Sequence, residues 1–406
     1  MDSLRAQNYV AELKKKYQTL PPVIYQLGYP GNFKDQQLNI EAKLEISKIQ
    51  PFITNSGSSL NIKEVPWISS VEVESDIILR LIAPWGGKEE NTWAYITTGG
   101  TEGNIAGVHF GLKELYPYKP ILIYSNESHF SISKAIELTK GQFSAILQIP
   151  TLRNGEINCK QIEPNVRNVI DQQDSAAGDI PSILVVATLG TTMKGACDDV
   201  CSILISLYSM GVTRDKIFVH LDAAFHGGFW HLDNHNPQYQ IGIEFNSIAI
   251  SGWKWYGADI CGLFAIYQRT SCTYSEQGFR EYLSINDIGI TSTRNGLNAI
   301  SWIIRFLQFD WQEEYNHCQK IVKYAVKQFQ SLDIETFVNP ASLTICTPTL
   351  PTLIIKKYCL ACYDDGHLGK ICHIIICPHV TEGLIDILVT DLRECIGEMK
   401  KTSWFK

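Results

Sequence analysis

From about Glu72 onward, the sequence alternates short β-rich runs with segments of helical length. Seven runs are too short for independent helices and are typical of buried strands; they are Trp93–Thr97, Pro120–Tyr124, Ala145–Ile149, Ile183–Ala187, Ile217–Leu221, Ser247–Ile250 and Leu263–Tyr267. Between most of them lie segments that fit helices: Glu102–Leu115, Ser131–Lys140, Lys160–Asp171 and Asp198–Met210. This alternation predicts an α/β fold in which helices cover a mostly parallel, seven-stranded sheet. In such a sheet, ligands bind beyond the carboxyl ends of the strands.

The segments on either side of this pattern predict two smaller parts. Residues 1–18 form an amphipathic, basic helical pattern, which fits either a surface arm or an arm that clasps a second subunit. A long helical pattern from Gly296 to about Leu332 is followed by predicted strands and a final helix at Leu343–Cys346, Thr352–Ile355, Ile371–Ile376 and Glu382–Lys400. We predict an N-terminal segment over 1–70, a large domain over 71–331 and a small C-terminal α+β domain over 332–406.

Composition and charge exclude several classes of protein. Of the 406 residues, 45% are hydrophobic and 19% are charged, which is typical of a folded protein. A net charge of −7 gives no overall attraction to phosphate backbones, so we expect no nucleic-acid partner. The longest apolar runs, such as Ile183–Leu189, are too short to span a bilayer, and the N-terminus lacks the apolar core of a secretory signal. We expect a cytoplasmic protein without a membrane partner, whose twelve cysteines are reduced and mostly buried.

A glycine-rich segment follows the first predicted strand and could bind an anion. It reads Thr97-Thr98-Gly99-Gly100-Thr101-Glu102-Gly103-Asn104 and leads into the next helix. Glycines let a ligand approach the backbone closely, and the N–H groups at a helix N-terminus favour a phosphate. Taken alone, such a turn also occurs for steric reasons, and this one lacks the lysine of a nucleotide-binding loop.

Two further strand ends supply a carboxylate and an amine. Asp222 follows a buried strand, where a carboxylate needs a cation such as a protonated ring nitrogen, although a helix cap would also explain it. Lys254 follows another strand among apolar neighbours, where a lysine with a lowered pKa can trap a carbonyl group, although a surface lysine is the commoner case. The combination with the phosphate site predicts pyridoxal phosphate, held on Lys254 as a Schiff base with Asp222 on the ring nitrogen.

The chain resembles the pyridoxal-phosphate-dependent group II amino-acid decarboxylases, most closely the histidine and serine decarboxylase branch. The resemblance extends from Leu27 to the final helix. It rests on six motifs in the same order: Gly99-Gly100-Thr101-Glu102-Gly103-Asn104, Ser128-His129-Phe130-Ser131, Gly190-Thr191-Thr192, Asp222-Ala223-Ala224, Ser251-Gly252-x-Lys254 and Thr293-Arg294-Asn295-Gly296. It implies an aspartate-aminotransferase-like fold (fold type I) and a homodimer with the active site at its interface.

The resemblance also implies roles for individual residues. Lys254 would carry the cofactor, His129 would stack on one face of its ring, and Asp222 would keep the ring nitrogen protonated. Tyr282 would be the acid that protonates the carbanion left after carbon dioxide departs, although an aromatic residue packed under a loop would also explain it. The cofactor-binding positions so implied are Gly100, Thr101, His129, Thr192, Asp222, Ala224, Ser251 and Lys254.

Two positions depart from the family pattern. Trp253 stands directly before Lys254, where relatives usually carry a histidine that touches the phosphate, so cofactor binding should be weaker or the pocket reshaped. His226 occupies a position where a smaller polar residue is common. These changes leave the chemistry of Lys254 possible, but they bear on the substrate and the reaction.

We expect the chain to convert a small L-amino acid into its amine and carbon dioxide, with histidine as the first candidate substrate and serine as the second. Three alternatives remain open on the same scaffold: decarboxylation with oxidation to an aldehyde, retro-aldol cleavage, and a non-catalytic partner of an active homologue. Cys359, Cys362, Cys372, His373, Cys377 and His379 could supply zinc ligands, but their spacing matches no standard finger, so we expect buried thiols and no metal.

Overall fold

The centre of the fold is a seven-stranded sheet, and all seven predicted strands are present. The computed structural model describes residues 2–19, 22, 25–60, 69–172, 181–268, 279–280, 285–286 and 288–402. The sheet has the order β2-β8-β7-β6-β5-β3-β4, and only β8 runs antiparallel to its neighbours. Its strands are Thr92–Thr97 (β2), Ile121–Ser125 (β3), Ala145–Ile149 (β4), Ile183–Thr188 (β5), Ile217–Asp222 (β6), Ser247–Ser251 (β7) and Gly262–Tyr267 (β8).

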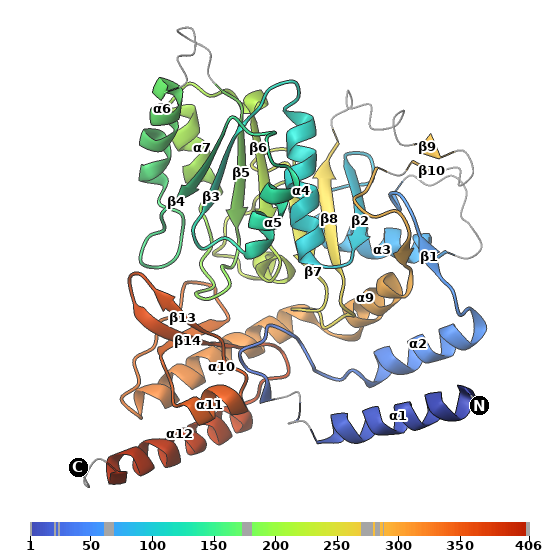
Figure 1. The fold of residues 1–406 in the computed structure, drawn as a ribbon, viewed down its shortest axis with the longest axis vertical. Coiled ribbons are helices and arrows are strands. Elements are labelled where there is room, and N and C mark those ends of the chain that lie inside the picture. The colour runs from blue at the N-terminus through green and yellow to red at the C-terminus, as the bar shows by residue number, and fades with distance from the viewer. Residues whose placement is uncertain are drawn as a thin grey trace.

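Helices cover both faces of this sheet (Figure 1). Along β5, Ile183 and Val185 join one hydrophobic core and Leu184 and Val186 join the other, so successive side chains are buried on opposite faces. The helices are Asp2–Gln18 (α1), Gln37–Ile49 (α2), Val71–Ile82 (α3), Gly100–Glu114 (α4), Phe130–Leu138 (α5), Ile162–Gln172 (α6), Val200–Tyr208 (α7), Leu297–Gln308 (α9), Trp311–Gln330 (α10), Thr352–Lys357 (α11) and Glu382–Thr402 (α12). Short 3-10 helices span Ala83–Trp85, Cys159–Gln161, Arg214–Lys216, His226–Gly228 and Trp230–Leu232.

A row of glycines lets α4 lie directly on the sheet. Gly103, Gly107 and Gly111 are spaced four residues apart and therefore share one face of the helix. A β-carbon at these positions would stand 2.8 Å from Ala249, 2.2 Å from the ring of His220 and 2.6 Å from Leu184, respectively. Because these distances are shorter than real β-carbon contacts, the close approach of α4 depends on glycine.

The C-terminal part forms a second, smaller sheet in the order β12-β14-β13, with all neighbours antiparallel. Its strands are Thr344–Pro348 (β12), Cys362–Asp365 (β13) and Gly369–Ile375 (β14). Figure 1 shows this sheet and helices α10, α11 and α12 beside one end of the large sheet. The remaining strands are two residues long: Thr54–Asn55 (β1) pairs with Arg294–Asn295 (β11), and Phe279–Arg280 (β9) pairs with Ile285–Asn286 (β10). The domain boundaries near residues 70 and 331 stay a prediction.

Two predicted elements of the C-terminal part were wrong. The long helix expected from Gly296 to Leu332 is broken after Gln308, because the side chain of Asp310 accepts hydrogen bonds from Gln312 and Glu313 and starts a new helix, α10. The strand expected at Thr352–Ile355 is instead the short helix α11, which begins after Pro351 and buries Ile354. The β-branched residues of this segment suggested a strand, but Pro351 has the geometry of a helix cap.

A buried ammonium group joins the two sheets. Lys194, in the loop after β5, is fully buried and lies 2.8 Å from Glu127 and 2.6 Å from Asp365. Glu127 follows β3 of the large sheet, and Asp365 ends β13 of the small one. The two parts of the molecule are therefore linked by paired charges as well as by apolar packing.

Three properties bear on the expected class of protein. Within the described ranges, no helix combines the length and the apolar character needed to cross a membrane. Every cysteine in the same ranges is a free thiol; some, such as Cys372 and Cys377, are buried, whereas Cys201, Cys359 and Cys362 are exposed. No cluster of three His, Cys, Asp or Glu side chains in the described chain could hold a metal ion.

Candidate active site

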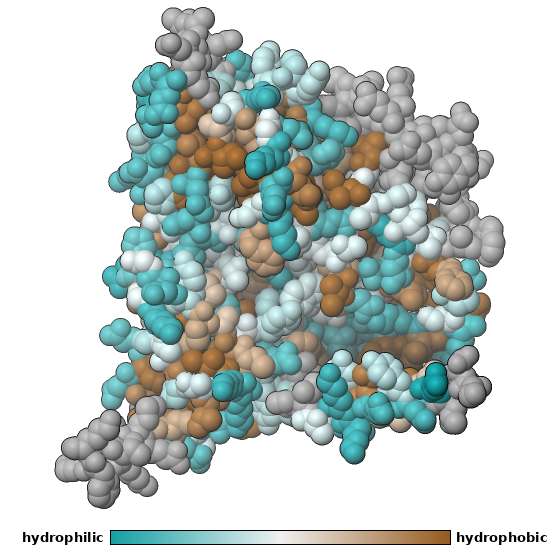
Figure 2. Space-filling view, in the orientation of Figure 1, coloured by the Kyte–Doolittle hydropathy of each residue, from teal (hydrophilic) through white to brown (hydrophobic). Residues whose placement is uncertain are grey.

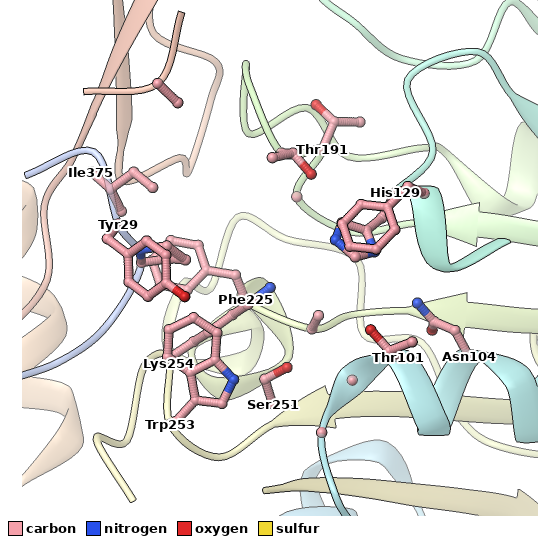
Figure 3. Close-up of a pocket in the computed structure, with 18 of the residues that line it drawn as sticks. Tyr29, Thr101, Asn104, His129, Thr191, Phe225, Ser251, Trp253, Lys254 and Ile375 are labelled. Atoms are coloured by element: carbon pink, nitrogen blue, oxygen red, sulfur yellow. The ribbon is translucent and has the colours of Figure 1, made fainter. Parts of the chain in front are cut away.

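A cavity of about 490 Å³ lies between the carboxyl ends of the large-sheet strands and the small sheet. Seven of the predicted site residues line it: Gly100, Thr101, His129, Thr192, Ala224, Ser251 and Lys254. Asp222 lies behind the wall, hydrogen-bonded to the lining residue Asn104. Tyr282 lies outside the described residues. Figure 3 shows how segments far apart in the sequence meet around the cavity, with Lys254 and Ser251 at one wall and His129 at another.

The N-terminus of α4 forms a cradle at one end of this cavity. A β-carbon at Gly100 would stand 2.7 Å from the hydroxyl of Ser251 and 3.3 Å from the β-carbon of Ala224, so only glycine leaves this space open. Gly99 caps α4 without a side-chain hydrogen bond, which leaves the N–H groups of the first turn available. Hydroxyl groups and free N–H groups are the donors that a phosphate needs.

An acidic residue in the same turn has hydrogen-bond partners for both of its carboxylate oxygens. One carboxylate oxygen of Glu102 accepts hydrogen bonds from the N–H and the hydroxyl of Thr98, both at 2.8 Å. The other accepts one from Thr291 at 2.7 Å. The sequence motif contained Glu102, but nothing in the sequence indicated Thr291 as its partner.

Asp222 is buried at the end of β6. One of its carboxylate oxygens accepts a hydrogen bond from Asn104 at 2.8 Å, and the other accepts one from the N–H of Ala224 at 3.3 Å. No ion pair within the described ranges involves Asp222. A buried carboxylate without a cation is unfavourable. A protonated ring nitrogen in the cavity would supply the missing charge.

Lys254 has the environment of a reactive amine. Burial lowers the pKa of its ammonium group, while the negative charge of Asp222 acts in the opposite direction. A lowered pKa increases the fraction of neutral amine, which is the nucleophilic form. The ammonium nitrogen lies 5.8 Å from the centre of the Trp253 ring.

His129 is held as a neutral ring at the start of α5. Its Nδ1 atom accepts a hydrogen bond from the N–H of Ser131 at 3.2 Å and lies 2.8 Å from the hydroxyl of the same residue. Burial lowers the pKa of His129, and the nearby Lys254 contributes in the same direction, whereas Asp222 raises it. A neutral, oriented imidazole is suited to stacking on a flat ring.

Apolar and aromatic side chains form the wall away from the cradle. Tyr29 packs on Trp253 with ring centres 5.2 Å apart, and both line the cavity with Phe225, Ile260 and Ile375. In Figure 3 the indole nitrogen of Trp253 is on the edge of the ring that faces Ser251. Sequence reasoning assigned no site role to Tyr29 or Ile375: Tyr29 comes to the cavity from the segment before α2, and Ile375 comes from β14 of the small sheet.

His226, the second departure from the family pattern, does not line the cavity. Its ring is fully buried, and neither nitrogen has a hydrogen-bond partner among the described residues. Burial, reinforced by the charge of Lys254, lowers its pKa to about 3. The ring is therefore neutral and acts as packing behind Phe225.

The donors of this cavity fit pyridoxal phosphate: a cradle for the phosphate, a buried carboxylate for the ring nitrogen and an amine for the aldehyde. The fold and the site thus define an enzyme of the pyridoxal-phosphate-dependent class. Residues 112–334 match the model of the pyridoxal-dependent decarboxylase conserved domain, and the chain belongs to that family. It is a pyridoxal-phosphate-dependent carboxy-lyase, and the prediction of this class and cofactor is confirmed.

The comparisons with individual proteins agree with this family. The chain is 27% identical to a histidine decarboxylase of Pseudomonas fluorescens over 91% of its length and 86% of that protein's. It is 29% identical to the histidine decarboxylase of Vibrio campbellii over 91% of both chains. In fold it is similar to the L-methionine decarboxylase of Streptomyces sp. 590, with a TM-score of 0.77, 17% identity and coverage of 97% and 95%. A Lactobacillus brevis glutamate decarboxylase gives a TM-score of 0.73, 14% identity and coverage of 97% and 92%. The predicted fold class is confirmed.

Proposed function

We propose that the chain decarboxylates histidine to histamine, with serine as the second candidate substrate. The observation that carries this proposal is that Lys254 and the cradle at Gly100 line one cavity whose outer wall is aromatic, while the buried Asp222 lies behind the cavity wall, bound to Asn104. Tyr29 and Trp253 offer flat apolar surfaces to an imidazole ring, which is largely neutral at pH 7. The two histidine decarboxylases that align along 91% of the chain support the same substrate.

The charges around the cavity support a substrate with an uncharged side chain. Glu102 is the carboxylate among the described lining residues, and its two oxygens are engaged by Thr98 and Thr291. Lys254 is the lining cation, and it is assigned to the chemistry. Apart from Glu102 and Lys254, the described lining residues offer a side chain of fixed charge no Asp, Glu, Lys or Arg as an ionic partner.

We propose these roles for the site residues. When bound, pyridoxal phosphate supplies a carbonyl group that condenses with an amine and a ring that accepts the electrons of the broken bond. Gly100, Thr101 and Ser251 bind its phosphate, while His129 and Ala224 hold the two faces of its ring. Asp222 keeps a proton on the ring nitrogen, and Thr192 lies near the ring. Lys254 would hold the group through its side-chain amine.

Tyr282 stays our proposed proton donor to the carbon that loses carbon dioxide. This role rests on the family resemblance, since Tyr282 lies outside the described residues. Tyr282→Phe keeps the ring and removes the hydroxyl, so it should slow amine release. Amine formation at the wild-type rate would remove Tyr282 from the mechanism.

We also propose a homodimer in the cytoplasm. Hydrophobic side chains reach the surface around α2 (Figure 2), where Leu38 and Leu44 are 52% and 58% exposed. On α1, Tyr9 and Tyr17 are 62% and 63% exposed. A second copy of the chain would cover such surfaces. Sedimentation velocity of the full chain and of a chain without residues 1–18 tests this: a dimer that is lost on truncation supports the arm, and a monomeric full chain contradicts the proposal.

Product analysis tests the substrate directly. The purified protein is incubated with pyridoxal phosphate and, separately, with histidine, serine, methionine or glutamate, and the products are identified by mass spectrometry. Histamine, with carbon dioxide in equal amount, supports the proposal. Ethanolamine would move the substrate to serine, and an aldehyde would indicate the oxidative reaction. A retro-aldol product would replace decarboxylation altogether.

A further inference from the structure

A buried chain of hydrogen bonds connects the two residues assigned to the cofactor ring. The side-chain amide nitrogen of Asn104 donates to Asp222 and to the hydroxyl of Ser131, both at 2.8 Å. The Ser131 hydroxyl in turn lies 2.8 Å from Nδ1 of His129. Asn104 therefore stands between the carboxylate below the cavity and the imidazole that lines it.

The chain of hydrogen bonds continues from Asn104 inward to a second imidazole, that of His220. The carbonyl oxygen of Asn104 lies 3.0 Å from Nε2 of His220, and Nδ1 of His220 lies 2.9 Å from the hydroxyl of Ser247. Asn104 is 1% exposed, and Ser131, His220 and Ser247 are completely buried. Burial lowers the pKa of His220 to about 4, so its ring is neutral at pH 7 and carries one proton.

The donor and acceptor chemistry determines which atom donates in each of these hydrogen bonds. A carboxylate only accepts hydrogen bonds, so the amide nitrogen of Asn104 must face Asp222. Its carbonyl oxygen then faces His220, which requires the proton of His220 on Nε2. Nδ1 of His220 is left to accept from Ser247. On the other branch, Ser131 accepts from Asn104 and donates to Nδ1 of His129, which leaves the proton of His129 on Nε2.

We propose that Asn104 and His220 are positioning residues: neutral His220 orients the amide of Asn104, which holds Asp222 and, through Ser131, fixes the tautomer of His129. His129 thereby carries its proton on Nε2 and Asp222 keeps one orientation before any ligand binds. This inference rests on the proposed roles of Asp222 and His129 at the cofactor ring. It assigns function to two residues that take no part in bond breaking.

The direct test is the position of the proton on His220. The full-length protein, labelled with 15N-histidine, is examined at pH 7 by NMR correlations within the imidazole rings, without and with pyridoxal phosphate. The His220 signal is identified by its loss in His220→Gln. A proton on Nε2 in both samples is expected. A proton on Nδ1 would mean that His220 does not donate to Asn104, and it would overturn the proposal. Apart from His220→Gln, which assigns the signal, this measurement uses only the wild-type protein.

The second test is cofactor affinity in matched variants. Asn104→Leu and His220→Leu remove the hydrogen bonds, whereas His220→Gln keeps an N–H donor near the position of Nε2. We expect the first two to raise the Kd for pyridoxal phosphate about tenfold and His220→Gln to stay within about threefold of the wild type. Equal Kd values for wild type, Asn104→Leu and His220→Leu would overturn the proposal.

Asn55 provides the control for a merely structural effect. It is also a buried asparagine that donates to a serine hydroxyl and a carboxylate, Ser70 and Glu74, but away from the cavity. Asn55→Leu should lower the stability of the protein and leave the Kd for pyridoxal phosphate unchanged. A tenfold rise of the Kd in Asn55→Leu would show that loss of stability alone explains the effect of Asn104→Leu, and it would contradict a positioning role. Failure of the wild type to bind pyridoxal phosphate would instead refute the proposed function, while the tautomer of His220 could still be read.

Discussion

Gly107 of α4 lies directly against the imidazole of His220 on β6, so that a β-carbon at position 107 would stand 2.2 Å from Nδ1 of the ring. His220 fills the space between this helix and β7, where its partner Ser247 lies. The closeness of helix and sheet therefore sets the position of the ring that holds Asn104.

Gly107→Ala should consequently affect both stability and the site. Because the ring has no room to move in a packed core, we expect a loss of about 1–3 kcal/mol in the free energy of unfolding and a rise in the Kd for pyridoxal phosphate. The control is Gly383→Ala on α12, where the nearest atom to the new β-carbon is 3.9 Å away and helix propensity should add up to about 1 kcal/mol. Urea unfolding measures both; equal stabilities of the two variants would contradict the packing argument.

Lys254→Ala should abolish the visible absorbance of the protein with pyridoxal phosphate and lower the rate of amine formation about a thousandfold or more. Lys88→Ala is the control, because Lys88 is exposed and does not line the cavity. Absorbance spectra and initial rates are compared at equal protein concentration. An unchanged spectrum of Lys254→Ala would remove this lysine from the cofactor site.

Trp253 should contribute to cofactor binding through its indole N–H, which a phenylalanine lacks. Trp253→Phe is expected to raise the Kd for pyridoxal phosphate about fivefold, equivalent to roughly 1 kcal/mol for one neutral hydrogen bond. Trp253→His restores the residue usual in the family and should lower the Kd below the wild-type value.

The control for Trp253 is Trp230→Phe. It removes an indole N–H bond of 2.8 Å to Pro237 outside the cavity, and it should leave the Kd unchanged. Identical titrations of wild type, Trp253→Phe and Trp253→His would show that position 253 shapes only the pocket wall.

The stability that His220 provides should depend on pH in a defined window. Burial lowers its pKa from 6.5 to about 4, with Asp222 opposing the change. Well above pH 6.5 the ring is neutral in both the folded and the unfolded protein. Below pH 6.5, His220 binds a proton in the unfolded protein but stays neutral in the folded one. The stability provided by the neutral ring is therefore lost as the pH falls toward 4.

His220→Gln isolates this effect from all other titrating groups. The advantage of the wild type over His220→Gln in unfolding free energy should be constant above about pH 7.5 and shrink by at most about 1.4 kcal/mol per pH unit below 6.5. Urea unfolding of both proteins at several pH values between about 8 and 5 measures it. An advantage that stays constant down to pH 5 would show that the ring is charged or accessible in the folded protein.

The large sheet could be predicted from sequence because its strands are continuous apolar runs separated by helical periods. The hydrophobic pattern was a weaker guide in the C-terminal part. Asp310 caps a new helix, α10, and Pro351 caps the helix α11 where a strand was predicted, and the hydrophobic pattern reveals neither cap. Strand β13 was not predicted, since its residues are mostly exposed and polar.

The chemistry of the site was predictable only where a motif carried it. Gly100, Asp222 and Lys254 stand at strand ends, so the chain order alone placed them near one another. Tyr29 comes to the cavity from a segment before the sheet begins, and His220 looked like an ordinary strand residue until its two hydrogen bonds were seen. Such contacts depend on three-dimensional packing and produce no periodic pattern in the sequence.

The buried ammonium of Lys194 has a consequence for how far the two sheets can move apart. Glu127 follows β3 of the large sheet and Asp365 ends β13 of the small one, so moving the two sheets apart would leave Lys194 without one of its two carboxylate partners, at a cost of several kcal/mol. We therefore expect the large and small sheets to keep their relative placement when a ligand enters the cavity between them.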